Sequence, residues 1–265
     1  MISLYNLIKE QIEGPKAIIL AGAPGAGKGY VLSGLNLDGI KVLNVDQGYI
    51  DLLKKANVSL DLKNAGPEAR SKASIAMAAA NKEFKGKVAS TIEGKESFIL
   101  DGTAASIKQT ANLKKELEEA GYEVFMLYVY TDLERSLKQN QGRFDKSKGE
   151  DRSLAPGIVL RSWSQVTDNF KAYKAMFDSN FVSVANTLQD EKTDNLQDII
   201  KKYLDPFKPQ GTKPKDEKAQ LRSDKSKEAL NAKLLTLLSD EAVEDIISTS
   251  VSKEEAQGKI KQFLS

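Results

Sequence analysis

Short apolar runs alternate with longer amphipathic stretches along most of this chain. Between these runs, the stretch 105–120 repeats apolar residues at near-helical spacing until Gly121 ends the pattern. The alternation predicts an α/β fold in which helices flank a parallel five-stranded sheet. The runs that predict the strands are 17–21, 41–45, 98–100, 124–130 and 181–185.

The two ends of the chain depart from this alternation. Residues 4–12 place apolar side chains on one helical face, so we expect an opening helix that packs on the core. The apolar periodicity continues to residue 205, so we predict a first domain over residues 1–205. Pro, Gly and Lys then predict a charged linker over 206–225. Short amphipathic segments resume over 226–265 and predict a small helical module or a docked hairpin, a C-terminal appendage to the main domain.

Composition limits the chemistry more than charge does. The 265 residues include 39 basic and 37 acidic side chains, and a net charge of +2 is too small to imply nucleic-acid binding by the whole molecule. The chain has no cysteine and no histidine, so catalysis would need carboxylates, Lys, Arg and a metal held by oxygen. No apolar run approaches the roughly 20 residues that span a bilayer. We expect a cytoplasmic protein that makes no membrane contact.

A glycine-rich segment follows the first predicted strand. Its residues GAPGAGK match the pattern G-x-x-x-x-G-K and precede a run that can form a helix. Glycines let successive backbone amides converge on phosphate oxygens, while the lysine neutralises the β- and γ-phosphates. The alternative, a turn with an exposed lysine, fits the flanking strand and helix less well. The predicted binding site for ATP or GTP comprises Gly22, Ala23, Pro24, Gly25, Ala26, Gly27, Lys28, Gly29 and Tyr30.

The residue after the lysine departs from the usual P-loop. Gly29 stands where a Ser or Thr hydroxyl normally binds Mg²⁺, and Tyr30 follows it. We therefore expect Mg²⁺ to be held through water at this position. The missing hydroxyl also fits a protein whose catalysis is weak.

Polar residues close three of the predicted strands, where ligands bind in open α/β sheets. Asp101 is the candidate metal ligand, directly or through water, and its alternative is a turn or capping residue. Asp46 could accept the proton of a substrate hydroxyl, with a helix N-cap as the alternative. Asn186 could lie near the nucleotide base, although a turn-forming residue is the simpler interpretation.

An arginine-containing segment follows the fourth predicted strand. Arg143 and Arg152 flank the charged stretch 142–152, which has almost no apolar side chains. We expect this stretch to be a lid, poorly ordered without nucleotide, whose guanidinium groups close over the γ-phosphate. Solvated arginines in a charged loop are the alternative. We expect Arg135 and Arg161 to lie on helix surfaces or to serve in packing.

The ordered set GAPGAGKG, LNVDQGY, FILDGT, TDLERSLKQNQGR with EDRSLAP, and FVSVANT resembles the zeta-toxin and polynucleotide-kinase-like P-loop kinases over about residues 15–205. The resemblance implies a P-loop NTPase-type sheet in the order second, third, first, fourth, fifth strand. It also implies that Lys28 binds phosphate and that Asp46 serves as the base. Lid arginines of that family, which contact the triphosphate, match Arg143 and Arg152.

These observations predict a kinase that uses ATP or GTP and Mg²⁺. Acceptors in the resembling family include a sugar hydroxyl of a nucleotide-sugar and the 5′-hydroxyl end of a nucleic acid, so the acceptor itself stays open. A second hypothesis is a catalytically weak, nucleotide-binding regulatory or assembly protein whose residues 226–265 engage a protein partner. A nucleotide hydrolase is a third, disfavoured because a lid and a strand-end base suit transfer with water excluded.

Overall fold

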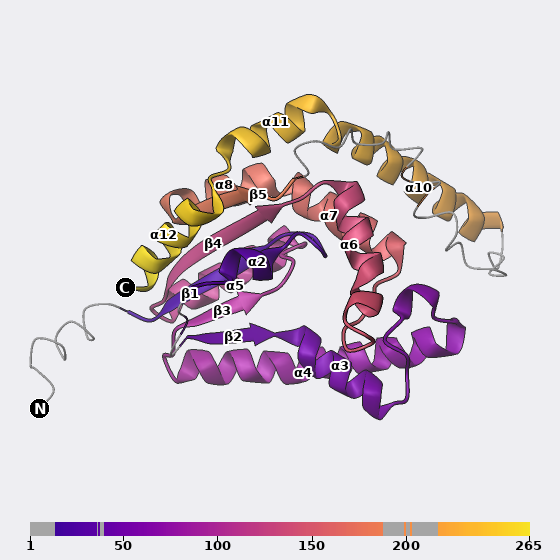
Figure 1. Ribbon diagram of the computed structural model, residues 1–265, viewed down its shortest axis with the longest axis horizontal. Coiled ribbons are helices and arrows are strands. Elements are labelled where there is room, and N and C mark those ends of the chain that lie inside the picture. The colour runs from indigo at the N-terminus through magenta and orange to yellow at the C-terminus, as the bar shows by residue number, and fades with distance from the viewer. Residues whose placement is uncertain (1–13, 36, 38–39, 188–198, 200–201, 203–216) are drawn as a thin grey trace, which may run out of the picture.

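A five-stranded parallel sheet forms the centre of the protein (Figure 1). The computed structural model describes residues 14–35, 37, 40–187, 199, 202 and 217–265. The strand order β2-β3-β1-β4-β5 confirms the predicted fold class, and each strand lies within two residues of its predicted place. The strands are β1 (Lys16–Ala21), β2 (Lys41–Asn44), β3 (Phe98–Asp101), β4 (Glu123–Tyr130) and β5 (Phe181–Ala185).

Helices cover both faces of the sheet (Figure 1). None of the described helices is both long and apolar enough to cross a membrane. The predicted helix over 105–120 is α5, whereas the expected opening helix over 4–12 lies outside the described residues. The helices are α2 (Lys28–Leu32), α3 (Val45–Lys55), α4 (Pro67–Glu93), α5 (Ile107–Glu119), α6 (Leu133–Lys146), α7 (Pro156–Asp168), α8 (Phe170–Phe177), α10 (Glu217–Leu237), α11 (Asp240–Thr249) and α12 (Lys253–Leu264), with 3-10 turns η1 (Leu62–Asn64) and η2 (Asp178–Asn180).

The central strands bury side chains on both of their faces. Ala17 and Ile19 of β1 belong to one apolar cluster, and Ile18 and Leu20 belong to another on the opposite face. Burial on both faces explains why the strands appear in the sequence as continuous apolar runs. A third cluster joins α3 to α4, and Phe144 of α6 packs against it.

The C-terminal helices complete the two main clusters instead of forming a module with its own core. Leu234 and Ile246 belong to the first cluster, and Ile260 and Phe263 to the second. Figure 1 shows α10, α11 and α12 in an arc along the β5 side of the sheet. Strand β5 lies at one edge of the sheet, and an edge strand leaves backbone groups unpaired. The backbone amide of Val251, which follows α11, donates to one of these groups in β5.

The linker is shorter than the sequence predicts. Helix α10 begins at Glu217, inside the predicted linker 206–225, whose first part lies outside the described residues. A short amphipathic segment has the same pattern whether it packs on its neighbours or on a distant core, so the sequence could not show this packing. The domain boundary at residue 205 stays a prediction, and the shared clusters count against independent folding of 1–205.

Candidate active site

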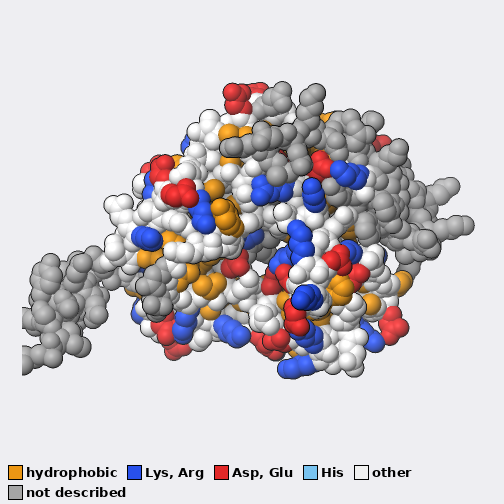
Figure 2. Space-filling model, in the orientation of Figure 1, with side chains coloured by type: hydrophobic (Ala, Val, Ile, Leu, Met, Phe, Trp, Pro, Cys, Tyr) orange, Lys and Arg blue, Asp and Glu red, His pale blue; other side chains and the backbone are white. Residues whose placement is uncertain are grey.

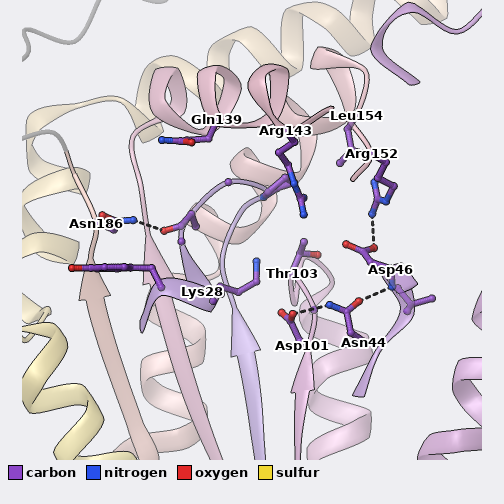
Figure 3. A pocket seen from close by; sticks show the side chains of 18 of the residues that line it. Lys28, Asn44, Asp46, Asp101, Thr103, Gln139, Arg143, Arg152, Leu154 and Asn186 are labelled. Carbon is purple, nitrogen blue, oxygen red and sulfur yellow. Dashed lines mark hydrogen bonds and ion pairs between the residues drawn. The ribbon is translucent and has the colours of Figure 1, made fainter. Parts of the chain in front are cut away.

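A cavity of about 860 Å³ lies where several strands of the sheet end. Figure 2 shows charged side chains of both signs around the hollow on this face, and Figure 3 shows the residues inside it. Of the residues predicted for the site, Gly22 and Ala23 alone do not line the cavity, since they form the base of the loop. The lining residues are Pro24, Gly25, Ala26, Gly27, Lys28, Gly29, Tyr30, Asn44, Val45, Asp46, Met77, Asp101, Gly102, Thr103, Arg135, Gln139, Arg143, Arg152, Leu154 and Asn186.

Glycine is required at two positions of the loop. Gly25 and Gly27 have φ angles of 80° and 88°, in the left-handed region that disfavours other residues. A Cβ at Gly27 would lie 2.3 Å from the side-chain nitrogen of Asn186. That nitrogen donates to the carbonyl of Ala26 at 2.9 Å, so Asn186 braces the loop from β5. The loop therefore has its tight shape through backbone geometry and one distant amide.

Lys28 folds back onto its own loop. Its Nζ donates to the carbonyls of Gly22 at 3.0 Å and Ala23 at 3.4 Å. Burial lowers the pKa of this ammonium, the carboxylates of Asp101 and Asp46 act in the opposite direction, and Arg143 lowers the pKa further. The negative charge of a triphosphate would compensate the cost of burying the ammonium.

Asn44 connects the carboxylate of Asp101 to the backbone of Asp46 (Figure 3). Its Nδ2 donates to Oδ2 of Asp101 at 2.7 Å, and its Oδ1 accepts from the amide of Asp46 at 2.6 Å. Asn44 is therefore the N-cap of α3, and the alternative capping role for Asp46 is wrong. Burial raises the pKa of Asp101, while Lys28 and the hydrogen bond from Asn44 oppose that rise.

Arg152 lines the cavity beside Asp46. Its Nη2 donates to Oδ1 of Asp46, and its guanidinium lies over the ring of Tyr49 at 5.2 Å. Only 8% of the Arg152 side chain is exposed. Within the described part of the chain, its Nε and Nη1 atoms are buried without a hydrogen-bond partner. Unsatisfied buried donors are costly, and an anionic ligand in the cavity is a suitable partner for them.

Arg143 reaches the same space from the last turn of α6. Figure 3 shows its side chain pointing into the cavity, and Asp151 binds its Nε and Nη2 at 2.8 Å each. Both predicted lid arginines therefore face the cavity. Ion pairs with Asp151 and Asp46 hold them there, and their expected inward movement on nucleotide binding stays a prediction.

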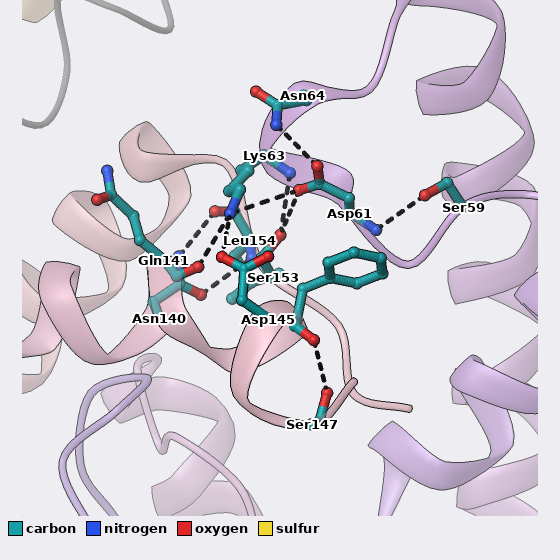
Figure 4. Close-up of polar contacts among 11 residues, drawn as sticks. Ser59, Asp61, Lys63, Asn64, Asn140, Gln141, Asp145, Ser147, Ser153 and Leu154 are labelled. Atoms are coloured by element: carbon teal, nitrogen blue, oxygen red, sulfur yellow. Dashed lines mark hydrogen bonds and ion pairs between the residues drawn. The ribbon is translucent and has the colours of Figure 1, made fainter. Parts of the chain in front are cut away.

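The segment 142–152 is anchored better than its composition suggests (Figure 4). Lys63 donates from η1 to the carbonyl of Gln141 at 3.0 Å and to Asp145 at 3.3 Å. Just after the segment, Ser153 donates to Asp61 at 3.0 Å. These contacts join the predicted lid to the α3–α4 region. Nothing in the periodicity indicated them, because the partners are about 80 to 90 positions apart in the chain.

Some lining residues were missed or misplaced by the sequence. Arg135, expected on a helix surface or in packing, lines the cavity, and its Nη1 donates to the backbone carbonyl of Asn186 at 3.1 Å. Its spacing of eight residues from Arg143, about two helical turns, was an available signal. No signal in the sequence marked Thr103 or Met77. Thr103 follows a strand-end acid in a loop, and Met77 lies within a long helix.

The acids present fit a weakly held Mg²⁺. Among the residues that the structure describes, no three carboxylate, His or Cys side chains gather into a metal-binding group. Mg²⁺ commonly uses one or two carboxylates together with substrate phosphates and water. Asp101 can supply such a carboxylate, and Gly29 can supply no hydroxyl. The donor set therefore fits a metal that arrives with the nucleotide.

Together these features define a P-loop kinase-like protein. The sheet order, the glycine-rich loop after β1 and the polar residues at the ends of β2 and β3 support this class. The family model described as Zeta toxin matches residues 4–202, more than half of the chain. The chain belongs to the Zeta toxin family.

Solved structures agree with this fold. A structure from the PezAT chromosomal toxin–antitoxin system of Streptococcus pneumoniae is 16% identical, covers 89% of this chain and 94% of its own, and has a TM-score of 0.50. The AvrRxo1-ORF1:-ORF2 structure with ATP is 14% identical, with coverages of 97% and 82% and a TM-score of 0.51. At these identities the likeness shows the fold alone. No curated protein matches the sequence.

Proposed function

We propose that this chain is an ATP- or GTP-dependent phosphotransferase that phosphorylates a hydroxyl group. Membership of the Zeta toxin family supports the general class of P-loop phosphotransferase. One observation carries the proposal to this chain: Lys28 and Asp46 line one cavity from two different elements, with Arg143 and Arg152 in the same cavity. A phosphate-binding lysine and a carboxylate that share one cavity suit transfer between two bound substrates.

Each residue has a distinct role in the proposed reaction. The loop amides and Lys28 bind the β- and γ-phosphates, and Arg143 stabilises the charge that spreads over the transferred phosphoryl oxygens. Asp46 accepts the proton of the acceptor hydroxyl. Asp101 would hold Mg²⁺, which when bound neutralises charge on the β- and γ-phosphates.

The ion pair between Arg152 and Asp46 limits when Asp46 can act. The oxygen of Asp46 that accepts from Nη2 of Arg152 is occupied, so the hydroxyl of an acceptor would have to compete for it. Nε and Nη1 of Arg152 have no hydrogen-bond partner among the described residues, so they can donate to a phosphate that enters the cavity. We infer that substrate binding draws Arg152 toward phosphate and releases one oxygen of Asp46 for the acceptor.

The acceptor class follows from the family resemblance and is the finer part of the proposal. A nucleotide-sugar and a nucleic-acid 5′ end both present a hydroxyl near phosphate. The cavity is lined by Val45, Met77 and Leu154, which would offer apolar contact to either compound, and by Arg152, which would offer positive charge.

Transfer of label from γ-labelled ATP or GTP tests the proposal. The purified chain is incubated with Mg²⁺ and either nucleotide-sugars or 5′-hydroxyl oligonucleotides, and label is followed in acceptor and in free phosphate. We expect labelled acceptor that disappears with Asp46→Asn and persists with Asp51→Asn, an exposed acid on the same helix. Label in free phosphate alone would support a hydrolase and contradict the transfer.

A second candidate is a nucleotide-binding regulatory or assembly protein. Gly29 in place of a hydroxyl residue and the occupied oxygen of Asp46 favour it. Its partner would bind through residues 226–265, where Leu235 and Ile247 are 62% and 43% exposed. Nucleotide binding without transfer to any acceptor, together with loss of a co-purifying partner in a Leu235→Ser/Ile247→Ser variant, would favour this candidate.

A further inference from the structure

Tyr30 is a large aromatic side chain left exposed in the cavity. It lies in the first turn of α2, two residues after Lys28, and is 61% exposed. A P-loop cradles the α- and β-phosphates with its amides while the lysine reaches toward the γ-phosphate. Residues just after the lysine therefore lie at the α-phosphate end, beyond which the ribose and base continue. Tyr30 is placed at the nucleoside end of the site.

The C-terminal helix α12 holds this tyrosine. Nζ of Lys253 lies 3.8 Å from the centroid of the Tyr30 ring and also donates to Oγ of Ser33 at 3.2 Å. A cation over an aromatic face is attracted by the ring quadrupole. Because Lys253 covers one face while most of the side chain stays exposed, the ring retains accessible surface for a ligand.

The same helix also closes the end of α2. Nε2 of Gln257 donates to the carbonyls of Val31 and Ser33, both at 2.8 Å. Helix α2 has five residues, so its final carbonyls have no partners further along the helix. Gln257 satisfies them from a position more than 220 residues away in the chain. This contact sets the position of the short helix that carries Tyr30.

Arg135 and Asn186 line the same cavity as Tyr30. The backbone carbonyl of Asn186 accepts from Nη1 of Arg135 at 3.1 Å, and the side-chain Nδ2 of Asn186 donates to the carbonyl of Ala26 in the P-loop. The nucleoside end therefore offers an aromatic ring, a held guanidinium and an amide. Stacking on aromatic and guanidinium planes is a common way to bind a nucleobase.

We propose that Tyr30 is the surface on which the base of the nucleotide stacks, and that Lys253 and Gln257 are positioning residues that hold it. The inference rests on the proposed function only in that a nucleoside triphosphate binds the P-loop. Residues of α12 lie beyond 202, where the match to the Zeta toxin family model ends. The C-terminal helix thereby becomes part of the nucleotide site.

Binding of ATP compared with inorganic tripolyphosphate tests the proposal, because tripolyphosphate has no base or ribose. Calorimetry on the full chain gives both dissociation constants. Tyr30→Ala should weaken ATP binding about 10-fold, within the range measured for loss of base stacking, and leave tripolyphosphate binding unchanged. Tyr30→Phe should bind both like the wild type, and Lys28→Ala should weaken both.

A double-mutant cycle tests the positioning role. Lys253→Met should weaken ATP binding several-fold in the wild-type background and have no effect in the Tyr30→Ala background, because its effect passes through the ring. Lys253→Arg should restore binding, and Gln257→Ala should behave like Lys253→Met. Equal effects of Lys253→Met in both backgrounds would overturn the positioning role.

The outcomes separate this inference from the proposed function. ATP binding that depends on Lys28 but not on Tyr30, or a Tyr30→Ala variant that loses ATP and tripolyphosphate equally, overturns the stacking role alone. ATP binding that depends on Tyr30 without transfer to any acceptor supports the stacking role and removes the kinase. A wild-type chain that binds no nucleoside triphosphate overturns both.

Discussion

The two sides of the cavity are held in place by different kinds of interaction. On the nucleotide side, backbone geometry fixes the loop: Gly25 and Gly27 adopt left-handed φ angles, and Lys28 binds carbonyls of its own loop. On the acceptor side, side-chain ion pairs fix the shape, with Arg152 bound to Asp46 and Arg143 bound to Asp151. Backbone geometry leaves the proposed nucleotide side little freedom, whereas we expect the proposed acceptor side to exchange ion-pair partners when a charged substrate enters.

This difference has a consequence for mutations. A side chain removed from the nucleotide side should reduce binding of the triphosphate itself, since the loop has no substitute for it. A side chain removed from the acceptor side should chiefly reduce transfer, because its contacts strengthen as the phosphoryl group moves.

The largest effect is expected for Lys28→Ala. Among the described residues Lys28 is the only lysine that lines the cavity, so its loss should reduce transfer about 1,000-fold and weaken nucleotide binding. Steady-state kinetics and calorimetry measure the two effects. Unchanged nucleotide affinity and turnover in a folded variant would remove the P-loop assignment and with it the contrast between the two sides.

Asp46→Asn should reduce transfer about 100- to 1,000-fold with nucleotide affinity within about twofold, since only the acceptor proton loses its destination. The matched control is Asp51→Asn, which changes an exposed acid on the same helix. Circular dichroism checks that loss of the ion pair to Arg152 leaves the fold intact. Wild-type transfer by the Asp46 variant would leave its carboxylate a structural partner of Arg152.

Arg143→Ala should reduce the transfer rate about 100-fold while it changes ground-state nucleotide affinity much less. Asp151→Asn, which removes the partner of Arg143 and keeps its guanidinium, is the control and should reduce transfer less. Amide hydrogen exchange tests the predicted closure of 142–152 with and without a non-hydrolysable triphosphate. Equal exchange in the two states would remove lid movement from the mechanism.

Phe263→Ala tests the support that the C-terminal helices give to the sheet. Phe263 is 9% exposed, and the centroid of its ring lies 4.9 Å from the ring centroid of Phe125 in β4. Its truncation should destabilise the fold by about 3 kcal/mol, as measured by denaturant unfolding. An unchanged unfolding free energy, or a stable fragment 1–205, would show that the C-terminal helices are dispensable for folding.

The smallest effect concerns the pH dependence of stability at Asp101. Burial raises the pKa of this carboxyl above its ordinary value of 3.8. The contribution of the protonated Asp101 carboxyl to the free energy of unfolding is therefore full below that pH and is lost as the pH rises through the folded-state pKa. The unfolding temperature of Asp101→Asn relative to wild type should be higher at pH 7 than at pH 3.5. A difference that does not grow with pH would contradict the raised pKa.

The sequence by itself determined the sheet and the phosphate loop, and the family resemblance implied the strand order. A buried parallel strand needs a continuous apolar run, and a loop that wraps a phosphate needs glycine at fixed spacing, so both constraints are local and visible in the residues. The acids at Asp46 and Asp101 were found for the same reason, since each directly follows a predicted apolar run; Asp101 ends β3, and Asp46 lies in the first turn of α3. All of these features depend on neighbours within a few positions in the chain.

Only the tertiary structure decided which residues meet across long separations. The pair of Arg152 with Asp46 joins positions 106 residues apart, and Gln257 caps α2 from more than 220 residues away. Charged and amide side chains of this kind carry no periodicity, so a pattern cannot tell a solvated group from a buried partner. The packing of α10, α11 and α12 onto the sheet was hidden likewise, because an amphipathic helix shows that it has an apolar face and not which surface that face covers.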